Sequence, residues 1–487
     1  MPEAQLPKKL SLFDVTNLVV GAIIGADIYV ASSFGAGYLG PFSLLVWVFA
    51  GLIAIVIALC FAQCAALIPK VGGPYAYAKE AWGPFAGFTV GWSLWFAEWI
   101  SLAVFPLAFT RYLMFFFPNM DLLTQILVKG VFVAFLAVTN IVGVKAAGKI
   151  NDVLTIAKLA PLIFFAVAGL SWMILNPSVT AANFMPFLPF GFTNFGTALV
   201  LIFWAYAGFE IGTIPSEEIS EPRKTIPKAI IIGISIVTVF YLATNVVLFG
   251  VRNWSMLAND TAPLATATNS ILTSTGLVAL LGGALVGIGA LISVAGSDES
   301  GMIGTSRLGY ALAADGLFPT VFAKIHKKFK TPYISIAIQS VTALVASIVG
   351  SLGLLISVSV FFLSVAYLAT SASIFTFHKR GLTPNRKSKK QLIIPALGVA
   401  FSVYLISQCT LLQIGVGVLL LLVGVPIYIW YSPKKELTEL KRSFLSPQAT
   451  FNRVRETEHV FLADFLTHSR RLYRRVTKKE QNKSAKD

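Results

Sequence analysis

Two stretches of the sequence place glycine and an acidic residue inside long apolar runs. The first contains Gly25 and Asp27, and the second contains Gly208 and Glu210. Each run is near the ~20 residues that a helix needs to cross a bilayer. A helix that breaks inside a membrane frees backbone N–H and C=O groups, which can bind a solute or an ion. One break alone would also suit close helix packing, but two predict a binding site at mid-membrane.

Asp27, Lys158 and Glu210 are expected inside the membrane, where charged side chains are costly and usually functional. For Asp27 three interpretations stay open: it caps the following half-helix, it recognises an ammonium group, or it binds a proton. The long side chain of Lys158 can either snorkel to the surface or pair with groups inside the bundle. Glu210 is either a functional acid or a buried, hydrogen-bonded strut. The opposite wall of the site is predicted at Trp92, Trp95, Glu98 and Trp99, which have helical spacing, and for the tryptophans lipid-interface anchoring is the alternative.

The composition requires apolar surroundings for the elements that hold these residues. Of the 487 residues, 56% are hydrophobic and 12% are charged, and the mean hydropathy is +0.77. Apolar length and breaker clusters predict about twelve helical spans. We expect them at 12–36, 41–68, 84–116, 125–143, 151–175, 193–218, 228–250, 276–302, 333–350, 354–378, 391–410 and 412–431. The sequence therefore predicts an all-α integral membrane protein.

The basic residues indicate how the chain is oriented. Short loops on one predicted side hold most of the Lys and Arg residues, whereas Arg111 and Arg252 stand nearly alone on the other. Because positive loops face the cytoplasm, both termini are expected there. This arrangement gives a cytoplasmic segment at 1–11, a transmembrane domain at 12–431 and a basic cytoplasmic tail at 432–487, which can contact anionic lipid.

Several function classes are disfavoured. The net charge of +16 is spread over alternate loops and the tail, so we expect no nucleic-acid partner. The three cysteines form no disulfide framework, and we expect neither a metal nor a cofactor. The four histidines lie in predicted loops or in the tail without a paired nucleophile or ligand spacing, and we therefore expect no enzyme activity.

Four stretches together resemble the amino acid-polyamine-organocation (APC) permeases. They are 24–29 (IGADIY), 69–77 (PKVGGPYAY), 203–210 (FWAYAGFE) followed by Glu217, Glu218 and 221–230 (EPRKTIPKAI), and Ser306-Arg307 with 314–319 (ADGLFP). The resemblance implies a LeuT-like fold of five plus five spans in inverted repeats, with discontinuous first and sixth helices and two extra helices. The repeats would cover about 12–175 and 193–378, and the extra helices about 391–431.

The resemblance also implies secondary active transport of amino acids by alternating access in the cell membrane. A polyamine or cationic amine transporter or exchanger is an alternative, and so is a nutrient sensor that has lost transport. The substrate would contact the first break at Ile24, Gly25, Ala26 and Asp27, and the second at Phe203, Trp204, Ala205, Tyr206 and Gly208. Asp27 stands where the family mostly has glycine, and its charge would repel a substrate carboxylate. Lys158 resembles a lysine that replaces bound sodium in proton-coupled members, so we expect proton symport involving Lys158, Asp27 and Glu210.

Overall fold

A computed structural model describes residues 11–68, 72–142, 147–210, 219–272, 277–383 and 389–432, and their regular secondary structure is helical. The chain divides into two units, Met1–Trp430 and Tyr431–Asp487. The predictions for the tail, for nearly all of segment 1–11, for 69–71 and for Glu217 and Glu218 lie outside the described residues. The fold below is that of the first unit.

The helices of this unit follow in chain order, with η marking short 3-10 helices. The first part contains α1 (Leu12–Ile23), α2 (Asp27–Leu39), η1 (Gly40–Phe42), α3 (Ser43–Leu67), α4 (Pro74–Trp82), α5 (Pro84–Leu113), α6 (Leu122–Val142), α7 (Ala147–Leu175), α8 (Pro177–Asn183), α9 (Phe195–Phe203) and η2 (Trp204–Tyr206). The second contains α10 (Pro222–Val251), α11 (Trp254–Ala258), α12 (Pro263–Ile271), α13 (Leu277–Ala314), η5 (Thr320–Ala323), α14 (Tyr333–Val349), α15 (Leu352–Lys379), η6 (Lys389–Leu392), α16 (Ile393–Gln408) and α17 (Leu411–Tyr431).

The lengths of these helices confirm the predicted all-helical membrane class. Among the described residues, nine helical stretches are long and apolar enough to cross a bilayer, and one of them, Asp27–Leu67, joins two predicted spans through η1. Two shorter apolar helices, Phe195–Tyr206 and Tyr333–Val349, fall where further spans are predicted, and a third, Leu12–Ile23, forms the first half of the span predicted at 12–36.

Helix α13 is longer than the span predicted at 276–302, because its polar second half stays helical up to Ala314. A Schellman motif ends it: the N–H of Gly316 donates to the carbonyl of Ala313, and the N–H of Leu317 to that of Leu312. Gly316 has a φ of +74°, which glycine adopts without strain. This geometry explains the glycine of the 314–319 stretch.

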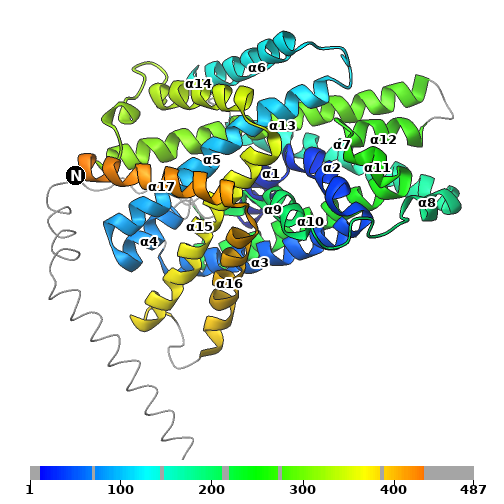
Figure 1. Ribbon diagram of the computed structural model, residues 1–487. Coiled ribbons are helices and arrows are strands. Elements are labelled where there is room, and N and C mark those ends of the chain that lie inside the picture. The colour runs from blue at the N-terminus through cyan, green and yellow to red at the C-terminus, as the bar shows by residue number, and fades with distance from the viewer. Residues whose placement is uncertain are drawn as a thin grey trace, which may run out of the picture. The chain divides into compact units, whose positions relative to one another are not determined.

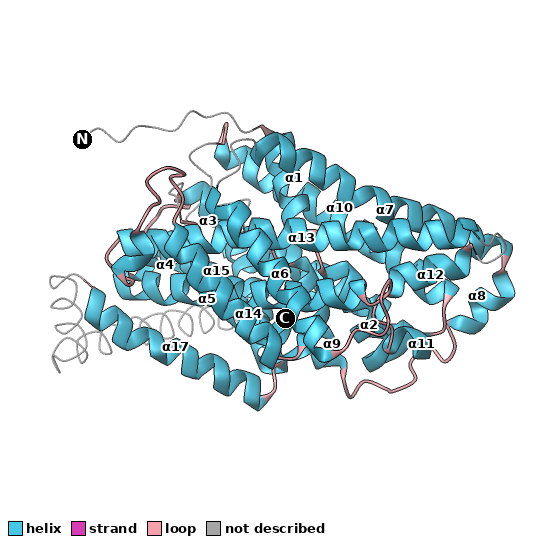
Figure 2. Cartoon of the chain, turned by 90° about the horizontal axis from the view of Figure 1, so that it is seen from above, coloured by secondary structure: helices cyan, strands magenta, loops and turns pink. Residues whose placement is uncertain are grey.

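The bundle brings distant parts of the chain together. Helix α5 packs against α13 and α15, and α10 packs against α1 and α3. Figures 1 and 2 both place α4 at one end of the bundle and α8, α11 and α12 at the opposite end. Residues 23–30 at the first predicted break and 208–210 at the second are buried, so side chains of several helices can reach both breaks.

Candidate functional site

The first break separates α1 from α2. Helix α1 starts with a capping box between Ser11 and Asp14, and it ends where Ile24 adopts an extended conformation with ψ of 102°. Helix α2 then begins at Asp27 without a side-chain cap at Ala26. The prediction of a discontinuous helix at this point is confirmed.

Helix α13 supplies hydroxyl groups to the carbonyls that this break exposes. Ser297 Oγ donates to the carbonyl of Ile24 and Ser293 Oγ to that of Gly25, both at 3.4 Å. A Cβ at Gly25 would lie 2.7 Å from Ser297 Oγ, so only glycine lets α13 approach so closely. The break is therefore stabilised by α13.

The second break follows α9 and η2. Ala207 is extended, with ψ of 154°, and Gly208 has a φ of +114°. A Cβ at Gly208 would lie 2.9 Å from the carbonyl oxygen of Ala22, which belongs to the last turn of α1. The two breaks thus touch each other, and glycine is required at the contact for both its conformation and its size.

Tyr241 of α10 links the two breaks. Its hydroxyl lies 3.1 Å from the carbonyl of Ile23 and 2.9 Å from that of Ala205. A hydroxyl has one hydrogen, so it donates to one carbonyl at a time. Tyr241 is fully buried, and it can therefore exchange between two carbonyls that the helix breaks leave without intrahelical partners.

A cavity lies at the junction of the breaks and is bounded by residues of α1, α2, α5, η2, α13 and α15 and by the stretch that follows η2. Its walls come from the two breaks and from α5, α13 and α15. They are formed by Gly21, Ala22, Asp27, Glu98, Ser101, Leu102, Phe105, Trp204, Ala207, Gly208, Glu210, Ser297, Ser300, Gly301 and Leu363. Small, polar and acidic side chains thus line this space together with the apolar and aromatic side chains of Leu102, Phe105, Trp204 and Leu363, as expected of a solute site.

The predicted substrate residues divide into two groups around this cavity. Three of them line it: Asp27, Trp204 and Gly208. Glu210, which is predicted for proton coupling, lines it as well. Six do not: Ile24, Gly25, Ala26, Phe203, Ala205 and Tyr206. Tyr206, for example, donates its hydroxyl to the carbonyl of Trp47, and the Phe203 ring packs 6.2 Å from the Tyr367 ring. Contact of either group with a substrate stays a prediction.

Lys158 lies beside the first break, although it does not line the cavity. Its ammonium donates to Ser297 Oγ at 3.1 Å, and its side chain is only 3% exposed. Asp27 and Glu299 interact with it electrostatically. The alternative in which Lys158 snorkels to the surface is therefore wrong, because its ammonium is held within the bundle against α13.

Glu210 is the buried acid of the second break. Its Oε2 accepts hydrogen bonds from the N–H of Gly208, at 3.1 Å, and from the hydroxyl of Tyr367, at 3.3 Å. The strut interpretation of Glu210 therefore agrees with its geometry. Because Glu210 also lines the cavity, the structure leaves a functional role open to the same side chain.

The predicted wall at span three is only partly right. Glu98 lines the cavity, but Trp92 and Trp95 are buried in an aromatic cluster with Phe318. The indole N–H of Trp92 donates to a backbone carbonyl of α17. Helical spacing alone does not reveal which face of α5 looks into the cavity.

Several residues of the site were missed by the sequence analysis. These are the serines of α13, Ser101 of α5 and Tyr241 of α10. Serines and glycines cluster at 293–301 inside an apolar run, and this cluster could have indicated a polar helix face. Tyr241 has no such signal, because a tyrosine in an apolar span is usually read as packing.

Two stretches that carry the family resemblance meet at the end of the bundle near α4. Tyr75 donates its hydroxyl to Asp315 Oδ2 at 2.6 Å, and Lys79 forms an ion pair with the same oxygen at 3.6 Å. These contacts join α4 to the Schellman turn that ends α13. The short motifs at 69–77 and 314–319 thus form one structural contact.

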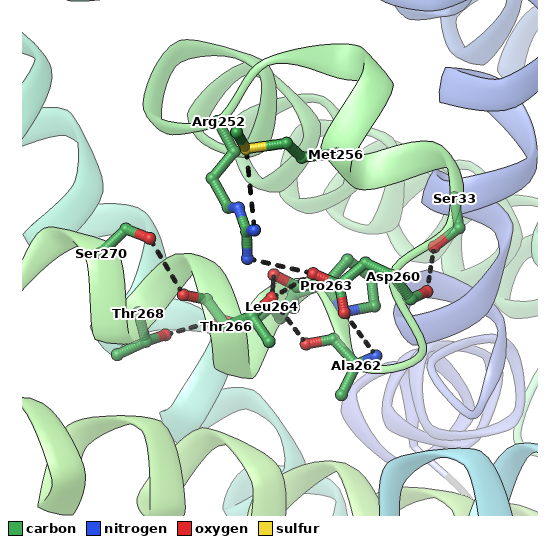
Figure 3. A network of polar contacts seen from close by, with 10 residues as sticks. All are labelled: Ser33, Arg252, Met256, Asp260, Ala262, Pro263, Leu264, Thr266, Thr268 and Ser270. Atoms are coloured by element: carbon green, nitrogen blue, oxygen red, sulfur yellow. Dashed lines mark hydrogen bonds and ion pairs between the residues drawn. The ribbon is translucent and has the colours of Figure 1, made fainter. Parts of the chain in front are cut away.

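A second polar network lies at the opposite end, around Asp260 (Figure 3). The carboxylate accepts hydrogen bonds from Arg252 Nη1 at 3.1 Å, from the N–H of Ala262 at 2.9 Å and from the hydroxyl of Thr266. The carbonyl of Asp260 accepts a hydrogen bond from Ser33 of α2. The connection between α11 and α12 is thereby tied to α10 and to α2.

Asp260→Ala should lower the free energy of unfolding by about 2–3 kcal/mol, because it leaves the guanidinium of Arg252 without its carboxylate. A matched control is Glu221→Ala, which removes an ion pair with Lys224 whose side chains are 70% and 74% exposed. That change should cost less than about 0.5 kcal/mol. Thermal unfolding of the detergent-purified protein compares the two, and equal melting temperatures would contradict the prediction.

Comparison with known proteins decides the family. The amino acid permease family matches residues 10–432. The chain is a member of this family. The predicted membership of the APC superfamily is confirmed, and the permease is a multi-pass membrane transporter, not an enzyme.

Individual relatives cover most of the permease. It is 29% identical over 452 residues to a branched-chain amino acid permease of Bacillus subtilis, covering 89% of this chain and 94% of that protein. It is 27% identical to a serine/threonine exchanger of the same organism, over 88% of this chain and 98% of that protein. The human cystine/glutamate transporter is 29% identical, over 88% of this chain and 85% of that protein. The family match, at residues 10–432, extends across both helix breaks.

Proposed function

We propose that the permease is a secondary active amino-acid transporter of the cell membrane that works by alternating access. The cavity at the junction of the two broken helices is the observation that carries this proposal. The relatives are named for branched-chain amino acids, for serine and threonine, and for cystine and glutamate. These compounds share an α-ammonium and an α-carboxylate, which supports an amino acid as the substrate.

The proposed architecture has twelve spans in two inverted repeats of five, plus two extra helices. The nine long stretches reach twelve when Asp27–Leu67 is divided at η1 and the apolar helices at Phe195–Tyr206 and Tyr333–Val349 are added, with α1 and α2 forming one broken span. The basic loops support cytoplasmic termini. Alternating access would then move one set of helices relative to the other around the two breaks.

The first turn of α2 is the proposed site for the substrate carboxylate. The first backbone N–H groups of a helix have no intrahelical partner and attract anions. Asp27 would oppose this attraction, but Lys158 interacts with it electrostatically and offsets its charge. An amino-acid carboxylate is therefore compatible with an aspartate at this position.

Proton symport is proposed through Lys158. Its hydrogen bond to Ser297 joins α7 to α13, and Ser297 in turn contacts the carbonyl of Ile24 in the first break. A protonated Lys158 favours this arrangement, whereas loss of the proton removes its charge from beside Asp27. The proton can thereby shift the balance between inward-open and outward-open states.

Reconstituted vesicles test the proposed transport. With acid outside, the permease should accumulate a labelled amino acid, and a protonophore should abolish the accumulation. Counterflow that does not depend on the proton gradient would contradict proton symport but would still support transport. Substrate binding without uptake or counterflow would contradict transport and favour the sensor alternative.

A polyamine or amine exchanger is the second candidate, because three acidic residues line the cavity. Competition for uptake separates it from an amino-acid transporter. If putrescine competes and no amino acid does, the amine alternative is correct.

A further inference from the structure

The acidic residues of the cavity differ in whether a positively charged side chain lies near them. Asp27, Glu98 and Glu210 all line it, and Asp27 has Lys158 beside it. Glu98 and Glu210 instead interact electrostatically with each other. Two acids near one another in a poorly solvated space need a cation or a shared proton to offset their charge.

Glu98 is the acid whose carboxylate remains available. Among the described residues it forms no hydrogen bond and no ion pair, whereas Glu210 accepts hydrogen bonds from Gly208 and Tyr367. Glu98 is intermediate in exposure although it lies in the middle of α5, so its side chain reaches the cavity rather than the protein interior. A carboxylate held open to a solute site can pair with a charge on the solute.

We propose that the permease selects amino acids with a positively charged side chain, and that Glu98, assisted by Glu210, recognises that charge. This inference rests on the proposed function and names its substrate class. It differs from the amine alternative because the substrate keeps its α-carboxylate at the first turn of α2.

The walls of the cavity suit the parts of such a substrate. Along α5, Glu98 precedes Phe105 by two turns, or about 10 Å, so that acidic and aromatic groups lie at different heights. The Phe105 ring packs 6.1 Å from the ring of Trp204. Leu102 and Leu363 add apolar surface to the lining, which suits the methylene stem of a lysine or arginine side chain. A neutral side chain would fill the same space but leave the charge of Glu98 without a partner.

The test compares three ligands of similar length in reconstituted vesicles. Arginine carries both a side-chain guanidinium and an α-carboxylate. Citrulline replaces the guanidinium by a neutral urea, and agmatine keeps the guanidinium but lacks the carboxylate. We expect arginine to compete for uptake at least tenfold better than either of the others. Each tenfold step corresponds to about 1.4 kcal/mol of binding free energy.

Glu98→Gln should bring the arginine-to-citrulline preference close to one, because the amide keeps the shape and removes the charge. Glu98→Asp keeps the charge and should retain most of the preference, which shows that the loss is not a folding defect. Asp121→Asn is the control: it removes an acid that caps the start of α6 and lies outside the cavity lining, so the preference should not change.

The outcomes separate this inference from the proposed function. The inference fails if neutral amino acids are transported and arginine and lysine are not. It also fails if Glu98→Gln keeps the preference for arginine over citrulline. Either result leaves the proposed amino-acid transport intact. If agmatine competes as well as arginine, the proposal that the first turn of α2 recognises the α-carboxylate of the substrate fails. If no amino acid is taken up or exchanged, the proposed function itself fails.

Discussion

Replacing Lys158 with methionine should abolish accumulation that is driven by a proton gradient. For one proton per substrate, a difference of one pH unit can drive about tenfold accumulation, because it is worth about 1.4 kcal/mol. Without the Lys158 ammonium between α7 and α13, the group proposed to gain and lose that proton beside the first break is absent. The accumulation ratio should therefore fall from about ten to about one.

Two further variants make the Lys158 experiment specific. Lys158→Arg keeps a positive charge that does not dissociate, so it should also lose coupling although the bundle keeps its cation. Lys129→Met is the matched control, because Lys129 is another buried lysine, and it donates to the carbonyl of Ser347 between α6 and α14. It should lower stability and keep the pH dependence. Full pH-driven accumulation by Lys158→Met would exclude the proposed coupling.

Gly208→Ala should reduce transport to a few per cent of the wild type and lower the free energy of unfolding by about 2–4 kcal/mol. The added Cβ would lie 2.9 Å from the carbonyl oxygen of Ala22 and 3.0 Å from its carbonyl carbon. Backbone atoms of α1 cannot move aside as a flexible side chain could, and a φ of +114° is unfavourable for alanine. The change would therefore push the two breaks apart.

Gly130→Ala is the control for Gly208. Gly130 lies inside α6, where an added Cβ meets no atom within 4 Å. Alanine there should be neutral or stabilise the helix by up to about 1 kcal/mol. Counterflow and thermal unfolding compare both variants, and wild-type exchange by Gly208→Ala would show that the contact between the breaks is dispensable.

The residues of the two breaks show why part of the site could be predicted. Glycine and acid inside an apolar run conflict with an uninterrupted lipid-facing helix, and this conflict is visible in the sequence alone. The structure places Asp27, Trp204, Gly208 and Glu210 around one cavity. The other predicted residues of the first break, Ile24, Gly25 and Ala26, do not line the cavity, and neighbouring α13 takes the carbonyls of Ile24 and Gly25. Their contact with a substrate stays a prediction.

Helix α5 shows that the sequence of a span does not by itself reveal which of its residues face the cavity. Trp92, Trp95 and Glu98 have helical spacing, but only Glu98 lines the cavity. The rotation of a helix about its own axis depends on the side chains packed against it. For α5 these come from α4, α6, α13, α14 and α15, and from the Trp92 contact with α17.

The sequence by itself determined that this protein is a helical membrane protein with interrupted spans, because bilayer thickness sets span length and a break requires residues that disfavour a continuous helix. Its short motifs also indicated the family. Only the tertiary structure decided how the breaks meet: Gly208 lies against Ala22, and Tyr241 reaches the carbonyl of Ile23 across 218 residues of sequence. Such contacts arise from the joint packing of helices distant in the chain, and no local pattern encodes them.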